Sequence, residues 1–218
     1  MKVIIATTAL AFTVFAVAAA HADNDFGVGL KAGTLGIGIE ASWQPLPYLD
    51  IRLGGNAFEF DDDGIQGGIP YDATFTLDTY YATGNLHFPV SPMRVTAGIY
   101  SNGNELRMIN DDGVDLDIGG ITFPGAGIGT LTSSTSFASS SPYLGIGFDF
   151  TLADKLGLNL DFGLLWQGEP EVTLEAGGSL SQDPLFQAAL ETERRQLEDE
   201  MSDFQAWPVV SLGIVYKF

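Results

Sequence analysis

The stretch LGLNLDFGLLWQ, residues 156–167, decides the fold class, because the polarity of its side chains alternates with a period of two. Even positions from Leu156 to Trp166 are apolar. Odd positions hold glycine, asparagine, aspartate or glutamine, with Leu165 as the one mismatch. Successive side chains of a β-strand point to opposite faces. The stretch is therefore predicted to be a strand with one apolar and one polar face.

Seven other segments repeat this alternation, and they are 26–34, 36–44, 49–53, 79–88, 93–101, 142–152 and 208–218. A tilted β-strand needs only about ten residues to cross a bilayer. The polar faces carry glycine and isolated charges, which suits a crowded interior. Aromatic residues lie near the ends of the apolar faces, with Trp43, Phe88, Phe150, Tyr216 and Phe218 at one edge and Trp166 at the other. This arrangement favours a transmembrane barrel with aromatic girdles over a soluble β-sandwich or lipocalin-like barrel.

The connections alternate in length as well. Those after the second, fourth and sixth segments are short, whereas 61–73, 102–141 and 168–206 are long. Short periplasmic turns and long extracellular loops are typical of outer-membrane barrels. We therefore predict an all-β, antiparallel up-and-down barrel of eight strands, which must close because lipid cannot satisfy backbone hydrogen bonds. Segments 104–109 and 114–118 are expected to extend a hairpin above the membrane; a barrel with ten strands results if they enter the bilayer instead.

The first 22 residues have the features of a secretory signal peptide. Lys2 is followed by an apolar run from Val3 to Ala20, and Ala20 and Ala22 provide the small residues that signal peptidase reads. The alternative is a transmembrane anchor, but a basic stop-transfer flank is missing. We therefore expect cleavage after Ala22, which leaves 23–218 as the barrel domain.

The chain resembles the small eight-stranded outer-membrane proteins of Gram-negative bacteria, the class of the OmpA membrane domain, OmpX and OmpW. The resemblance is sharpest in the final segment, 209–218, and 31–36 also looks like the first hairpin of proteobacterial barrels. In this class the barrel-assembly machinery recognises a terminal Phe preceded by alternating apolar or aromatic residues, here Leu212, Ile214, Tyr216 and Phe218. The resemblance implies a monomer in the outer membrane, in contact with lipid and lipopolysaccharide.

Eight charged residues face inward in this register, and they are Lys31, Glu40, Asp50, Arg52, Arg94, Asp149, Asp161 and Lys217. An eight-stranded interior is just wide enough for side chains to fill it. Four acids and four bases should pair there, because an unpaired buried charge is costly. We predict a charge plug with Arg52 and Arg94 at its centre. The alternative is a proton relay or a narrow channel for small solutes or ions.

Composition excludes several functions. The chain has 28 Asp and Glu against 9 Lys and Arg, which argues against nucleic-acid binding, and it has no cysteine for disulfides or thiolate metal sites. Most of the acid lies in the long connections. Asp61, Asp62, Asp63, Asp111 and Asp112 are weak candidates for divalent cations, although a solvated acidic loop is the commoner role. We predict no metal and no cofactor.

Catalysis is not expected. Barrel enzymes of this size that modify lipids resemble this chain in length, but they use a His with a Ser near the outer leaflet. His87 is the one histidine of 23–218 and is expected near the periplasmic end, far from the serine-rich stretch 133–141. A lipid-modifying enzyme therefore remains only an alternative.

The last long connection is predicted to contain a helix over 184–204. Asp183 is suited to the N-cap and Pro184 to the first helical position. Apolar residues follow at spacings of three and four, which leaves one apolar stripe. The helix is too long for the lumen, so we expect it to cover the barrel mouth; binding to a protein partner is the alternative.

Overall fold

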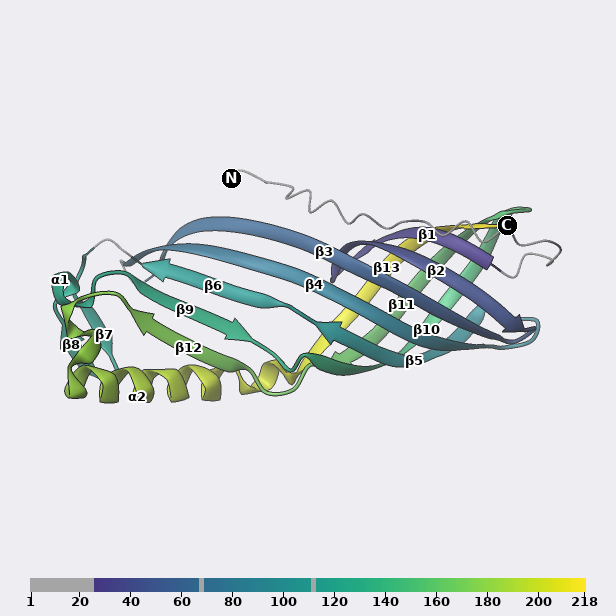
Figure 1. Ribbon diagram of the computed structural model, residues 1–218. Helices are drawn as coiled ribbons and strands as arrows, with labels where there is room; N and C mark the ends of the chain where they lie inside the picture. Colours follow the sequence, from purple (N-terminus) through teal and green to yellow (C-terminus); the bar gives the residue numbers. More distant parts are fainter. Residues whose placement is uncertain (1–25, 67–68, 111–112) are drawn as a thin grey trace.

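A computed structural model of the chain describes residues 26–66, 69–110 and 113–218. Eight antiparallel strands form a closed barrel (Figure 1). They are β1 (Phe26–Gly33), β2 (Gly36–Leu46), β3 (Leu49–Gln66), β4 (Ile69–His87), β5 (Met93–Asn102), β10 (Ser140–Ala153), β11 (Leu156–Trp166) and β13 (Ala206–Lys217). The ring closes through the pairings of β1 with β13 and of β4 with β5. The predicted eight-stranded barrel is thus confirmed, and the ring does not contain ten strands. The predicted signal peptide lies outside the described residues.

The alternating pattern divides the barrel wall into two faces. Outward side chains such as Leu30, Leu53 and Leu212 are exposed, whereas their strand neighbours point into the lumen and are mostly buried. The exposed set includes all six predicted girdle aromatics, and it also includes Leu212, Ile214, Tyr216 and Phe218 of the expected insertion signal. A wall whose outer side is apolar and whose inner side is polar is suited to lipid outside and to a filled lumen inside.

The two ends of the barrel differ strongly. The turns after β2, β4 and β10 are short and lie at the same end as the C-terminus, which we call the short-turn end (Figure 1). At the other end, the extended end, β3 and β4 run on as a ladder of 18 and 19 residues. At about 3.4 Å per residue such strands are roughly 60 Å long, so they reach far beyond the thickness of a bilayer.

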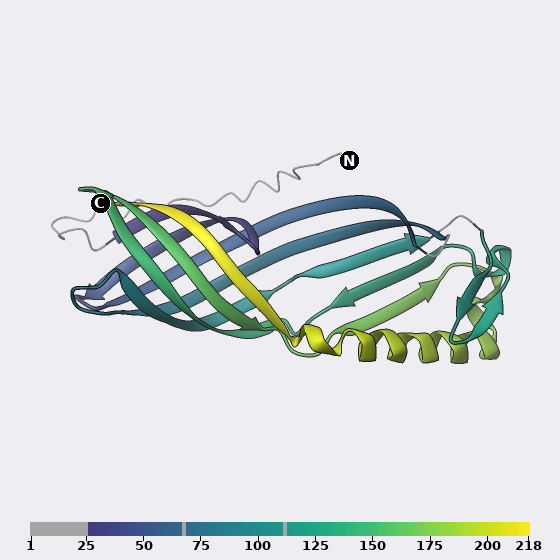
Figure 2. The ribbon, with the colours of Figure 1, turned by 180° about the vertical axis from the view of Figure 1, so that it is seen from behind.

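Three further strands widen this ladder into a sheet on one side of the mouth, as Figure 2 shows from behind. β6 (Glu105–Asn110) pairs with β4, β9 (Leu131–Ser136) pairs with β6, and β12 (Glu171–Ala176) pairs with β9. The expectation that 61–73 is a loop is wrong for its described residues, which lie in β3 and β4. The expectation that 104–109 and 114–118 together extend a hairpin is also wrong, because β6, from the first segment, pairs with β4 and β9 instead. That second segment contains β7 (Leu116–Ile118), which pairs with β8 (Ile121–Phe123).

The physical reason lies in the backbone. Long connections contain many N–H and C=O groups that need partners, and a ladder that already exists in β3 and β4 offers the nearest ones. β6, β9 and β12 therefore add to the barrel's sheet instead of forming loops, whereas β7 and β8 satisfy each other in a separate two-stranded sheet.

An apolar core that is separate from the barrel lumen lies at the far tip of the extended sheet. It consists of Leu116, Ile118, Phe123, Ile128, Phe186, Ala189 and Leu190. Around it lie the short helices α1 (Gly125–Ile128) and η1 (Ser179–Gln182) and the longer α2 (Pro184–Glu200), which η2 (Ser202–Gln205) follows. No helix among the described residues is long and apolar enough to cross a membrane.

Helix α2 begins as predicted but lies elsewhere. The Asp183 carboxylate accepts hydrogen bonds from the backbone N–H groups of Leu185 and Phe186, which confirms the N-cap. The expectation that the helix covers the mouth is wrong, because α2 packs along β12 and β7 instead (Figures 1 and 2). Its apolar stripe is buried only at the N-terminal half, where Phe186, Ala189 and Leu190 join the tip core. This core fixes the helix against the sheet.

Candidate functional site

Seven of the eight predicted inward charges meet in one ion-paired network inside the barrel. Arg52 from β3 contacts three carboxylates: its guanidinium lies 3.4 Å from Glu40, 3.1 Å from Asp50 and 3.0 Å from Asp149. Lys31 Nζ lies 3.7 Å from the other oxygen of Glu40. The network therefore connects β1, β2 and β3 with β10, which lies far away in the sequence, across the lumen.

Arg94 on β5 is the most buried member of the network, with a relative exposure of 1%. Its Nε donates to Asp149 Oδ2 at 3.0 Å, and its Nη2 donates to Asp161 Oδ1 at 2.5 Å. Its Nη1 donates to the side-chain oxygens of Asn85 and Thr96. Every nitrogen of the guanidinium thus has a partner, which is what a charge removed from water requires.

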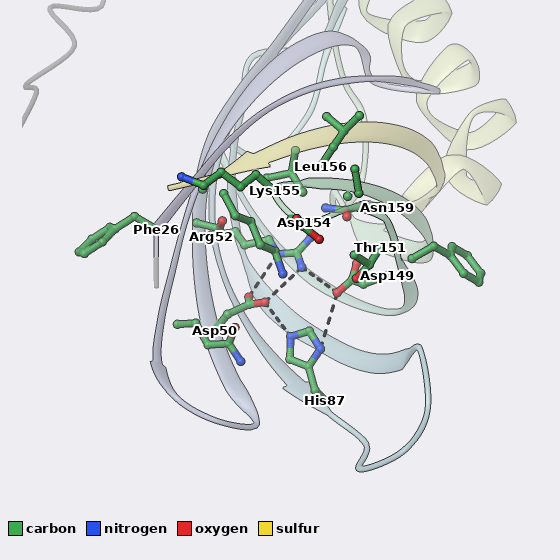
Figure 3. A pocket seen from close by; sticks show the side chains of 18 residues that line it. Phe26, Asp50, Arg52, His87, Asp149, Thr151, Asp154, Lys155, Leu156 and Asn159 are labelled. Carbon is green, nitrogen blue, oxygen red and sulfur yellow. Dashed lines mark hydrogen bonds and ion pairs between the residues drawn. The ribbon is translucent and has the colours of Figure 1, made fainter. Parts of the chain in front are cut away.

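His87, the last residue of β4, is a member that the sequence interpretation left out. Its Nε2 lies 2.7 Å from Asp50 Oδ2 and its Nδ1 lies 3.6 Å from Asp149 Oδ2, so the ring bridges two carboxylates (Figure 3). A signal was present in the sequence. His87 shares the odd-numbered positions of β4 with Tyr81, Thr83 and Asn85, which all face the lumen. With four carboxylates against Lys31, Arg52 and Arg94, the network is one positive charge short of neutrality when His87 is uncharged.

A layer of stacked tyrosines lies next to the charge network. The ring centroids of Tyr81 and Tyr100 are 4.8 Å apart, and those of Tyr100 and Tyr143 are 5.3 Å apart. The Tyr81 hydroxyl donates to Glu40 at 2.8 Å, which joins this layer to the charges. Leu35, Leu165 and Val209 pack against the tyrosines. Aromatic and aliphatic side chains therefore fill the lumen on the side of the ion pairs that faces the extended end.

The inward glycines make room for these large side chains. A Cβ at Gly147 would lie 2.4 Å from Arg94 Cζ, and a Cβ at Gly54 would lie 2.4 Å from the Tyr81 hydroxyl. Each glycine lies directly opposite the residue that covers it in the strand register. The glycine-rich polar face therefore reflects a crowded lumen, as the sequence suggested.

The remaining space is distributed unevenly along the barrel. A pocket of about 290 Å³ lies at the short-turn end and is lined by Asp50, His87, Asp149, Asp154 and Lys217, among others (Figure 3). Farther inside, two cavities beside Lys31 and Glu40 measure about 10 Å³ each, and the stacked tyrosines line one of them. A cavity of that size holds at most one water molecule. Lys217 lines the pocket and forms no ion pair with the described residues.

Asp50, His87 and Asp149 also form the one group of three possible metal ligands found among the described residues, with ligand atoms within 4.8 Å of one another. However, Arg52 Nη2 already donates to Asp50 Oδ2 and Asp149 Oδ2. A metal ion would have to displace this cation from both oxygens, so the donor set suits an ion-pair network better than a metal. Of the weak acidic candidates, Asp61 accepts a hydrogen bond from Thr74, Asp62 and Asp63 are exposed, and Asp111 and Asp112 lie outside the described residues.

Comparisons with known proteins agree on the fold. No family model matches the sequence, and curated proteins also give no match. Among solved structures, CarO2 of Acinetobacter baumannii is 21% identical over 88% of this chain and 98% of its own, with a TM-score of 0.57. CarO of the same organism is 22% identical over 88% of this chain and 97% of its own, with a TM-score of 0.56. The chain therefore adopts the fold of the small eight-stranded outer-membrane β-barrels.

Proposed function

We propose that the chain is a non-enzymatic outer-membrane barrel whose lumen is sealed by the Arg52–Arg94 charge network. In this proposal the short-turn end faces the periplasm and the extended end faces outward, because short turns are periplasmic in barrels of this kind. The protein stabilises the envelope or makes surface contacts through its extended sheet and α2. The observation that carries the proposal is the filled lumen, in which ion pairs and stacked tyrosines leave cavities of only about 10 Å³.

The charge distribution supports an outward role for the extended end. The segments 61–73, 102–141 and 168–206 together carry most of the net negative charge of the chain. An acidic surface of this kind repels anions, including lipopolysaccharide phosphates, unless cations bridge them. Cationic partners and basic peptides are therefore better suited to this surface than anionic ones.

A single-channel measurement tests the sealed lumen. The purified protein in a planar lipid bilayer is expected to pass almost no current, and Arg52→Ala, which removes three ion pairs, is expected to open measurable conductance. Arg195→Ala, on the exposed face of α2, serves as the matched control and should remain closed. A steady current through the unmodified protein contradicts the proposal.

A narrow channel is the second candidate, and the 290 Å³ pocket at the short-turn end favours it. This pocket would act as a vestibule, with His87 and Asp149 at its inner wall. The same measurement separates the two functions, because a channel conducts without any substitution.

The proposal excludes lipid modification. His87 contacts carboxylates at the short-turn end, whereas the serines of β9 lie in the extended sheet. Mass spectra of lipid A from cells with and without the protein should be identical, and a change in acylation would show an enzymatic role.

A further inference from the structure

At the extended end, the barrel wall is shortest at the β1–β2 hairpin, and we call this place the low point of the wall. The hairpin of β1 and β2 ends at Gly33–Gly36, and the pairing of β2 with β3 ends at Ile37 and Ala57. On one side of the hairpin, β3 continues to Gln66, so its edge has no strand partner from β2 beyond Ala57. On the other side lies the first part of β13, to which Thr34 is tied by a 2.8 Å hydrogen bond to the Pro208 carbonyl.

This low point contains an apolar notch of about 240 Å³. The hairpin provides its floor, and Phe58, Phe75 and Leu77 provide its inner wall. The complete lining is Ala32, Gly33, Thr34, Gly36, Ile37, Phe58, Phe75 and Leu77, without a charged side chain. Gly36 has a φ of +96°, and a Cβ there would lie 2.7 Å from Phe58 Cβ, so the tight turn itself keeps the floor close to the wall.

The notch lies at the upper boundary of the lipid-facing band. Ile37 points outward and is 64% exposed. The next outward residue on β3 after Ala57 is Glu59, and Asp78 lies opposite Ala57 on β4. The apolar surface therefore ends at the level of the notch, and its outer opening is continuous with the surface that contacts hydrocarbon.

We propose that this notch binds the acyl chain of a lipid from the surrounding outer leaflet. The inference rests on the proposed membrane location. An apolar hollow at the edge of the bilayer is a poor site for water, because its lining offers a water molecule too few hydrogen-bond partners, and such hollows favour apolar ligands. A flexible chain from the adjacent leaflet can enter without desolvating any charge. The hollow has a volume of only about 240 Å³, which suits a thin hydrocarbon chain better than the flat wall of a second barrel.

Trp207 of β13 offers a natural reporter for this site. Its ring stacks on Phe75 with centroids 6.2 Å apart, directly behind the inner wall of the notch. The other two tryptophans of the chain, Trp43 and Trp166, are exposed on the outer face of the barrel. Replacing both by Phe leaves Trp207 as the single emitter.

The experiment places the Trp43→Phe, Trp166→Phe protein in vesicles of phosphatidylcholine brominated on its acyl chains and measures fluorescence quenching. We expect clear quenching of Trp207, and we expect Ala32→Phe, which fills the notch, to reduce it at least twofold. Leu30→Phe is the matched control, since Leu30 faces lipid on the same strand but does not line the notch. If Ala32→Phe does not fold, Phe58→Asn makes the wall polar, with Phe60→Asn as its control.

Three outcomes overturn the inference. One is the absence of Trp207 quenching in a protein whose Trp166, tested in a Trp43→Phe, Trp207→Phe variant, is quenched normally. The second is quenching of Trp207 that Ala32→Phe and Phe58→Asn leave unchanged. The third is a dimer that these variants dissociate. If Trp166 also escapes quenching, the barrel is not in the bilayer, and the proposed function itself fails.

Discussion

Replacement of Arg94 by Met is expected to remove most of the stability that the charge network confers. The substitution keeps a side chain of similar length but deletes the donors to Asp149, Asp161, Asn85 and Thr96. Asp149 retains Arg52 at 3.0 Å, so the greatest loss falls on Asp161, which keeps only a hydrogen bond from Ser211 at 3.3 Å. Leaving a buried charge without its partner costs about 3–5 kcal/mol.

The assay is urea unfolding from lipid vesicles, followed by tryptophan fluorescence, with the heat-dependent gel shift as a check that the barrel has closed. Arg195→Met is the control. Arg195 is exposed on α2, and a surface ion pair of this kind contributes at most about 1 kcal/mol. The double variant Arg94→Met, Asp161→Asn should recover much of the loss, because a neutral amide leaves no uncompensated charge. If Arg94→Met lowers the free energy of unfolding by no more than the control does, the network is not a buried plug and the reasoning is wrong.

Three further predictions concern α2 and the first hairpin. Hydrogen bonds from Arg194, and also from Arg195, lower the pKa of Glu191 from its ordinary value of 4.5 to about 2. Since the folded pKa is the lower one, this stabilisation is complete above pH 4.5 and is lost as the pH falls toward 2. The protection of the α2 amides against hydrogen exchange, measured relative to their intrinsic exchange rate at each pH, should therefore fall over that range, and Glu191→Gln should remove this pH dependence of the protection. Asp183→Ala deletes the N-cap and should destabilise α2 by about 1 kcal/mol; its amides should exchange faster while those of the barrel do not, and equal acceleration of both would argue against a locally anchored helix. Gly36→Ala places a Cβ at φ +96° and against Phe58, so refolding into lipid should give a barrel less stable by at least about 1 kcal/mol, whereas Gly84→Ala, where a Cβ has open space, should have little effect.

The sequence alone determined the barrel. In a strand, side-chain direction depends only on the parity of the position, so the alternation at 156–167 and its seven repeats was enough to separate the outer from the inner face. The number of strands followed from those repeats, and the need to satisfy backbone hydrogen bonds in lipid required closure. The inward positions of Arg52 and Arg94, and the N-cap at Asp183, were predictable for the same local reasons.

Only the tertiary structure decided which inward residues meet. Arg52 and Asp149 are separated by 97 positions in the chain, and their contact at 3.0 Å depends on how the register and tilt of the strands close the ring. The same closure brings His87 between Asp50 and Asp149, where periodicity had indicated only that it lies near the short-turn end. The extended sheet and the position of α2 were also beyond the sequence, because the alternation stops at the bilayer boundary. Beyond that boundary, the position of each segment depends on which strand edges are free to pair and on which apolar side chains can be buried at the tip. The local periodicity of the sequence contains neither piece of information.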